Sequence, residues 1–205
     1  MKVETYVDYT KRMVESFESE NKNYAIFGSG FNIQKFSTYS DFYVESGTSH
    51  FIKVDDKLLM FGGEIIDVIE NFKNSSNFKQ LDYIVLSRVF EHLPIRTVDY
   101  YLYLFSCVLN NDGKLILVVP DHDWFVEKLT KEAKKENPNY FQMLRYNFAI
   151  FDEGLTKYDT HRIYCNRDTM RIFLTNENLF EIESIKDMFI DTTLEKDMEI
   201  ICKKK

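Results

Sequence analysis

The chain has 205 residues, of which 44% are hydrophobic and 29% charged, and it contains 18 Phe and 13 Tyr. This length and composition predict one globular domain over residues 1–205 and exclude a disordered chain. The formal net charge is -7, so no overall field would attract nucleic-acid phosphates or anionic lipids. We therefore expect no nucleic-acid partner and interpret the three C-terminal lysines, 203–205, as a solvated end.

The three cysteines, Cys107, Cys165 and Cys202, lie far apart and form no CxxC pair. They predict reduced packing residues, because a disulfide framework or a metal site needs paired or clustered ligands, so no metal is expected. The first segment, MKVETYVDYTKRMVESFESE, carries charges where a signal peptide needs an apolar run. No stretch reaches the roughly 20 apolar residues of a membrane span. We expect a cytoplasmic protein with no membrane association.

Hydrophobic spacing predicts an N-terminal helix within residues 1–22 and a short buried strand at 24–27, followed at once by Gly28-Ser29-Gly30. Further strands are predicted at 41–46, 50–55 and 64–68. The middle of the chain predicts a strand at 81–86, a helix at 97–109, a break at NNDG (110–113) and a strand at 115–119 that Pro120 ends.

Beyond Pro120, the charged and helical segment 121–165 is expected to lie on the acceptor side of a site, with helices near 123–136 and 140–151. Asn166 is predicted to cap a further helix. Two final strands, 181–189 and 198–202, predict an antiparallel hairpin. The expected fold is a three-layer α/β/α sandwich around a mostly parallel, seven-stranded sheet that ends in this hairpin.

The glycine pair of Gly28-Ser29-Gly30 comes where an apolar strand stops. Glycine permits a sharp turn and a close approach of a ligand to the backbone, so this turn is a candidate cofactor cradle as well as a plain tight turn. A dinucleotide fingerprint, GxGxxG, would need glycine at position 33, where this chain has Ile33. The pattern therefore argues against a nicotinamide-dependent enzyme.

A nucleoside-binding α/β fold also needs acceptors at the ends of its strands, commonly a carboxylate for the ribose hydroxyls. Asp55, after the FIKV run, and Glu45, after FYV, are the alternatives for that role. Asp67, in EIIDV, is the candidate acceptor for an adenine amino group. Each of the three also fits a solvated carboxylate at the end of a strand.

The segment LDYIVLSRVFEHLP, a following helix and LNNDGKLILVVPD together resemble the region between the fourth and fifth strands of class I methyltransferases that use S-adenosylmethionine (SAM). The Gly28-Ser29-Gly30 turn is similar to the first motif of that family, and THRIYCNRDTMRIFLTNENLFEIESI to its C-terminal region. The resemblance covers about residues 23–190. Two departures are the long segment between Gly30 and Asp55, and Asn178-Leu179-Phe180 where the family has Gly-Phe.

The resemblance implies a SAM site, with S-adenosylhomocysteine as product. Its implied residues follow the first four strands of the sheet: Gly28, Ser29, Gly30, Glu45 or Asp55, Asp67, Ser87 and Arg88. The activated sulfonium leaves the protein to align the acceptor and, where the acceptor is protonated, to supply a base. The implied acceptor is a small molecule or a glycan-like group.

Three histidines are candidate bases: His92, His122 and His161. His92 also fits a structural role at a helix end, and His122 a surface loop. His161 with Asp159, two residues apart in a polar stretch, is the preferred acid/base pair. Two other functions stay open at this point, namely a nicotinamide-dependent oxidoreductase and a non-catalytic scaffold with a degenerate cofactor site, and the oligomeric state is left open too.

Overall fold

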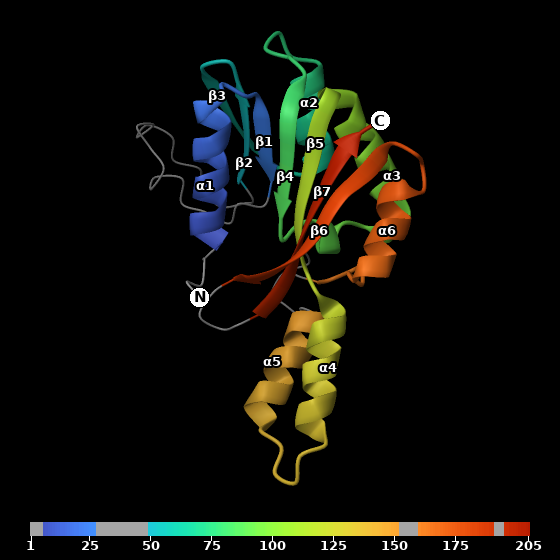
Figure 1. Cartoon of the computed structure of the whole chain (residues 1–205). Helices are drawn as coiled ribbons and strands as arrows, with labels where there is room; N and C mark the ends of the chain where they lie inside the picture. The colour runs from blue at the N-terminus through green and yellow to red at the C-terminus, as the bar shows by residue number, and fades with distance from the viewer. Residues whose placement is uncertain (1–5, 28–48, 152–159, 191–194) are drawn as a thin grey trace.

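The computed structural model describes residues 6–27, 49–151, 160–190 and 195–205 (Figure 1). The described elements, in chain order, are α1 (Tyr6–Ser19), β1 (Tyr24–Phe27), β2 (Ser49–Val54), β3 (Lys57–Gly62), α2 (Ile65–Lys73), β4 (Leu81–Ser87), the 3₁₀ turns η2 (Phe90–His92) and η3 (Ile95–Thr97), α3 (Val98–Val108), β5 (Leu109–Pro120), α4 (His122–Ala133), α5 (Tyr140–Phe151), α6 (Arg167–Thr175), β6 (Phe180–Ile190) and β7 (Glu195–Lys204). Among them, no helix combines the length and the apolar character needed to cross a bilayer.

The strands form one seven-stranded sheet in the order β3-β2-β1-β4-β5-β7-β6. β1 pairs in parallel with β4, and β4 with β5, whereas β2 and β7 run antiparallel to both of their neighbours. Five of the seven strands therefore point the same way, with β6 and β7 forming the C-terminal hairpin. The predicted α/β fold with a mostly parallel sheet is confirmed.

Helices cover both faces of this sheet (Figure 1). Tyr9, Met13 and Phe17 of α1 pack on one face, against alternate residues of β1, β4 and β5. The intervening residues of the same strands face α2, α3 and α6 on the other side and form the larger core. This alternation follows from the two-residue period of a strand, and it gives the three layers predicted from the sequence.

The hairpin of β2 and β3 was not among the predicted elements. A two-residue turn at Asp55 and Asp56 joins the strands, so that Val54 pairs with Lys57. Asp55 has a positive φ of 51°, a conformation that aspartate tolerates better than most residues and that tight hairpin turns require. β2 itself runs antiparallel to β1, so Asp55, which follows β2, lies at the side of the sheet where β1 begins.

The strand predicted at 64–68 is wrong, because these residues begin α2. Ile65, Val68, Ile69 and Phe72 are buried, and their spacing is that of one face of a helix rather than of a strand. The run EIIDV contains too few residues to distinguish the period of a helix from that of a strand. The buried face of the helix continues into ENFK. The strand expected at 41–46 lies outside the described residues.

The predicted break at NNDG lies within β5. Leu109 pairs with Leu81, and pairing resumes at Lys114 with Tyr83, so residues 110–113 form an irregularity in the strand. Asn110 Nδ2 donates to Asp82 Oδ1 over 2.8 Å, which fixes the loop of extra residues to the neighbouring strand. The remaining predicted helices and strands are confirmed, including Asn166, which caps α6 in a reciprocal capping box with Thr169.

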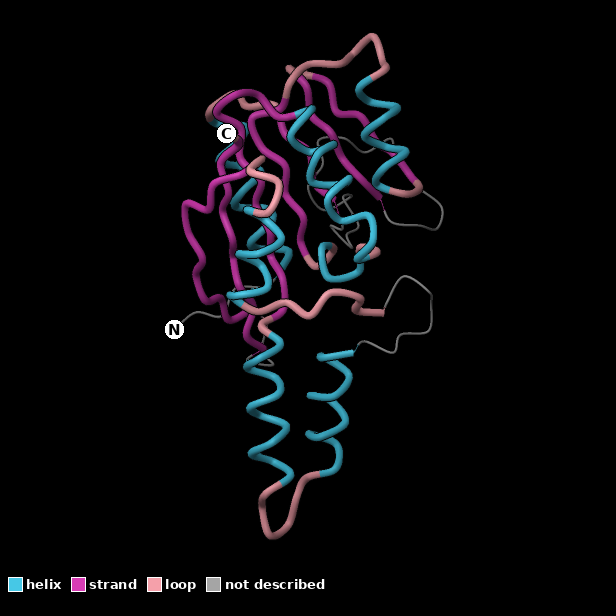
Figure 2. Tube along the Cα trace, turned by 90° about the vertical axis from the view of Figure 1, so that its right-hand side faces the viewer, coloured by secondary structure: helices cyan, strands magenta, loops and turns pink. Residues whose placement is uncertain are grey.

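The helices α4 and α5 lie side by side and project away from the sheet, beyond the edge at which β4 and β5 end (Figures 1 and 2). α4 follows β5 directly, because Asp121 caps its first turn by accepting a hydrogen bond from the Trp124 amide. The two helices fall within the segment 121–165.

Candidate functional site

The carboxyl ends of β1, β3, β4 and β5 meet at one edge of the sheet. Phe27, the last residue of β1, pairs with Leu86, and Ser87 pairs with Val118. The chain therefore enters Gly28-Ser29-Gly30 directly beside the turn that follows β4. Ligands of open α/β sheets bind at such an edge. Gly28, Ser29 and Gly30 themselves lie outside the described residues, as does Glu45.

Asp55 lies at the opposite edge of the sheet. Its amide donates to Asn23 Oδ1 over 2.8 Å, and its carboxylate pairs with Lys79 at 2.5 Å. Asn23 precedes β1, so these contacts place Asp55 at the amino end of β1, far from the turn after Phe27. The reversal of β2 causes this, and the ribose-binding role expected for Asp55 is not compatible with its position.

Asp67 lies in the first turn of α2, which begins shortly after β3 ends at the carboxyl edge. Its side chain is exposed, as is that of Glu64. Burial raises the pKa of the nearby Tyr101 hydroxyl, and the charges of Glu64 and Asp67 raise it further, while Arg162 acts in the opposite direction. Two carboxylates and a buried tyrosine therefore lie near one another at the start of α2.

His50 supports the same region, although no motif in the sequence singles it out. Its side chain is buried, and Nε2 lies 3.0 Å from the carbonyl oxygen of Gly63, which has a φ of 111°. The carbonyl can only accept, so Nε2 donates. Burial lowers the pKa of His50, and the neutral ring holds the connection between β3 and α2.

Ser87 is buried at the end of β4, and Arg88 follows with a positive φ of 55°. The Arg88 amide donates to the Val118 carbonyl over 2.8 Å. Its guanidinium binds Asp197 of β7 through two hydrogen bonds, Nε to Oδ2 at 3.0 Å and Nη2 to Oδ1 at 2.5 Å. The side chain of Arg88 thus links the turn after β4 to β7. If this turn contacts a ligand, its backbone makes the contact.

The three candidate histidines lie close together beyond the ends of β4 and β5: His92, His122 and His161. The ring centroids of His92 and His161 are 4.9 Å apart, and those of His122 and His161 are 5.1 Å apart. Glu91, completely buried, lies beside them. His122 is buried as well, so the surface-loop interpretation of that residue is wrong. Asp159, the partner expected for His161, lies outside the described residues.

The hydrogen bonds of His122 determine where its proton lies. The Cys165 amide donates to His122 Nδ1 over 2.6 Å. A backbone amide can only donate, so a neutral His122 carries its proton on Nε2. That nitrogen is 3.1 Å from Nδ1 of His161. His122 is therefore positioned to donate to His161 and to orient its ring.

Both of these histidines are neutral at neutral pH. Burial lowers the pKa of His122 to about 4, helped by the positive charge of Arg88. Burial, followed by the effects of His122, His92 and Arg88, lowers the pKa of His161 to about 3. A neutral imidazole has one nitrogen with a lone pair, which can accept a proton or bind a metal ion. The cluster therefore offers neutral nitrogen ligands beside a buried carboxylate.

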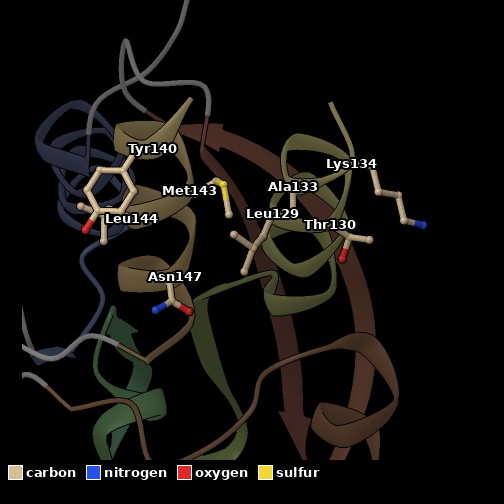
Figure 3. Close-up of a pocket in the computed structure, with 8 residues that line it drawn as sticks. All are labelled: Leu129, Thr130, Ala133, Lys134, Tyr140, Met143, Leu144 and Asn147. Atoms are coloured by element: carbon tan, nitrogen blue, oxygen red, sulfur yellow. The ribbon is translucent and has the colours of Figure 1, made fainter. Parts of the chain in front are cut away.

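A separate groove lies between α4 and α5 (Figure 3). Its volume is about 520 Å³, and its lining comes from both helices: Leu129, Thr130, Ala133, Lys134, Tyr140, Met143, Leu144 and Asn147. Leu129 and Met143 point into the space between the helices in this view. The lining of the groove holds none of the candidate acid/base residues and is formed largely by apolar side chains.

No family model and no curated protein matches the chain. Similar solved structures include the pyocyanin biosynthetic protein PhzM, at 15% identity over 62% of this chain and 31% of that one, with a TM-score of 0.39. A 1,6-didemethyltoxoflavin-N1-methyltransferase from Burkholderia thailandensis shows 10% identity over 65% of this chain and 48% of its own, with a TM-score of 0.41. A SAM-dependent methyltransferase from Methanosarcina mazei shows 16% identity over 65% and 64%, with a TM-score of 0.42. The chain thus spans less than two thirds of the length of each of these proteins. At such identities a function does not follow from structural similarity.

Proposed function

We propose that the chain is a SAM-dependent methyltransferase whose cofactor binds at the carboxyl ends of β1 and β4. The observation that carries the proposal is the pairing of Phe27 with Leu86, which brings the start of the Gly28-Ser29-Gly30 turn beside the turn at Ser87 and Arg88. Both segments belong to regions in which the sequence resembles class I methyltransferases. Gly28 and Ser87 are 59 residues apart by number, and the sheet pairs the residues that precede them, Phe27 and Leu86.

The residues at this edge fit an adenosyl cofactor. Asp67 offers a carboxylate for an amino or hydroxyl group, and the buried Tyr101 has its hydroxyl in the field of Glu64 and Asp67. The bound cofactor would supply an activated methyl group. The protein then has to hold that group in line with the acceptor and keep water out.

The histidine cluster is the proposed source of acid/base chemistry. In this proposal His161 faces the acceptor, and His122 positions His161 by a hydrogen bond to Nδ1. Asp159 stays the proposed partner of His161. His161 takes up an acceptor proton only when its Nε2 has the lone pair, which requires the proton on Nδ1 and the loss of the bond from His122. The tautomer of His161 therefore controls whether it can act as a base.

The proposed acceptor is a small molecule or a glycan-like group. Support comes from the projecting helices α4 and α5, which follow the carboxyl end of β5 and could cover an acceptor on that side (Figure 2). Their groove is formed largely by apolar side chains. We propose that the segment 121–165 selects the acceptor.

The proposal predicts that S-adenosylhomocysteine raises the melting temperature of the chain and that NAD does not. A ligand that binds only the folded state stabilises it by RT ln(1 + [L]/Kd), which is about 2.7 kcal/mol at a ligand concentration of 100 Kd. Differential scanning fluorimetry with each ligand at millimolar concentration makes the comparison. An unchanged melting curve with S-adenosylhomocysteine would favour the scaffold, and a rise with NAD alone the oxidoreductase.

Replacing Asp67 is expected to weaken cofactor binding. Asp67→Asn should reduce the affinity for S-adenosylhomocysteine by on the order of 1 to 3 kcal/mol, the usual effect of mispairing a polar contact. Asp67→Ala should cost more, because the amide of asparagine keeps one acceptor oxygen. The half-buried Glu70 of the same helix provides a control, since Glu70→Gln removes a charge at a residue whose carboxylate accepts from the Tyr100 hydroxyl and should bind normally. Wild-type affinity in both Asp67 variants, measured by calorimetry, would remove Asp67 from the site.

A further inference from the structure

Glu91, His92 and His161 form a cluster that the methyl-transfer proposal does not fully use. One potential ligand atom from each residue lies within 4.8 Å of the other two, and Glu91 Oε1 is 4.0 Å from His92 Nε2. The Glu91 side chain has no exposed surface, whereas that of His92 is 22% exposed. The cluster thus combines a buried carboxylate with two imidazoles and is open to solvent on one side.

Backbone contacts hold these residues in place. The Glu91 carbonyl oxygen accepts the amide of Arg162 over 2.7 Å and that of Ile163 over 3.1 Å. These two bonds fasten the η2 turn, which carries Glu91 and His92, to the segment that carries His161. The backbone positions from which the three side chains extend are therefore fixed relative to one another.

The two imidazoles share a second feature. His92 Nδ1 is 3.3 Å from the carbonyl oxygen of Thr160, and His161 Nδ1 is 3.3 Å from that of Ile150. Carbonyls only accept, so each contact is a hydrogen bond when Nδ1 carries the proton and Nε2 the lone pair. Metal-binding histidines commonly donate one ring N–H to a backbone carbonyl, which fixes the tautomer and the orientation of the ligand nitrogen.

We propose that Glu91, His92 and His161 bind a first-row divalent metal ion, with zinc as the reference ion, through Glu91 oxygen and the two Nε2 atoms. Two imidazoles and one carboxylate suit zinc, iron, cobalt or manganese, whereas magnesium and calcium take oxygen ligands. Three protein ligands leave at least one position of the ion open.

His122 competes with the ion for His161. Because the Cys165 amide donates to His122 Nδ1, the Nε2–H of His122 points at His161 Nδ1 and favours a lone pair there. A metal at His161 Nε2 requires the proton on Nδ1, so binding exchanges the His122 contact for the bond to Ile150. His122→Phe removes the competing N–H. We therefore expect this variant to bind zinc with an affinity equal to or higher than that of the wild type.

The open position of the ion suggests that the methyl acceptor is a hydroxyl group. This inference rests on the proposed function. A divalent metal lowers the pKa of a bound oxygen ligand. An acceptor hydroxyl bound there would lose its proton to solvent, because His161 would serve as a ligand while the ion is bound; the role of His161 as a base applies to the metal-free chain. The metal site itself rests only on Glu91, His92 and His161 and does not require that the chain bind SAM.

Calorimetric titration of the untagged, chelator-treated chain with zinc tests the site. We expect saturation at one ion per chain, with Glu91→Gln and His161→Asn each weakening the affinity at least about tenfold. His50→Gln is the matched control, because His50 is a buried histidine whose bond is to Gly63, and it should bind zinc as the wild type does. Visible absorption with cobalt should show nitrogen and oxygen ligands without thiolate charge-transfer bands.

Several outcomes would overturn the site. These are the absence of saturable binding, unchanged affinity in both ligand variants, or a cobalt spectrum dominated by thiolate bands. Circular dichroism shows whether each variant folds. If Glu91→Gln does not fold, His92→Asn, at the more exposed ligand, takes its place with the same expected loss. Titration of the same metal-free protein with S-adenosylhomocysteine reports separately on the proposed cofactor site.

Discussion

Arg88→Met is expected to lower the free energy of unfolding by about 3 to 5 kcal/mol, the usual cost of stripping a buried ion pair of one partner. Asp197 has no exposed side-chain surface, and the Arg88 guanidinium binds both of its carboxylate oxygens. Without Arg88, the Asp197 charge loses two charge-assisted hydrogen bonds in a position where water cannot replace them. Urea unfolding followed by circular dichroism measures the loss.

The double variant Arg88→Met with Asp197→Leu is the matched control. It removes the buried charge together with its partner, so it should recover most of the lost stability, because apolar residues of similar size often replace a buried ion pair at little cost. The Arg88 backbone conformation, with its positive φ of 55°, is equally unfavourable for methionine in the single and the double variant. A single variant as stable as the wild type would show that the ion pair contributes nothing.

Gly28→Val is expected to abolish binding of S-adenosylhomocysteine, with a loss of at least about a hundredfold, or on the order of 3 kcal/mol. The reason comes from the sequence, because Gly28 directly follows β1 at the carboxyl edge and a branched side chain would occupy the approach of the cofactor to the backbone. Calorimetry measures the affinity.

Gly28→Ala gives a graded comparison, because a single methyl group should cost less affinity than the two methyl groups of valine. Urea unfolding of both variants separates a loss of binding from a loss of folding. Gly28→Val protein that is folded and binds S-adenosylhomocysteine as tightly as the wild type would reduce the glycine pair to an ordinary turn.

Elements with long or continuous apolar patterns could be predicted from the sequence. β4 and the second half of β5 follow from the runs LDYIVL and LILVV, because strands buried on both faces need apolar residues throughout. α1 follows from the spacing of Tyr9, Met13 and Phe17. The prediction at 64–68 was wrong because a five-residue window fits both periods, and only the burial of Phe72 beyond it reveals a helix.

The candidate site was less predictable, because it depends on strand direction and on distant contacts. The antiparallel pairing of β2 with β1 could not be predicted from the sequence. This pairing places Asp55 at the side of the sheet opposite to the proposed cofactor site. The two-residue turn after Val54 indicates the hairpin of β2 and β3, but it does not indicate how β2 runs relative to β1. Nor does spacing along the chain reveal that His92 and His161 share one cluster with Glu91, because their contacts depend on how the 161–163 segment packs against the η2 turn.

A crystal structure of the chain with S-adenosylhomocysteine is the most direct test of the proposed cofactor site. The proposal predicts the ligand at the carboxyl ends of β1 and β4, with its adenine toward Asp67 and its sulfur toward the cluster of Glu91, His92 and His161. Density for the ligand at the amino edge near Asp55, or in the groove between α4 and α5 alone, would contradict it.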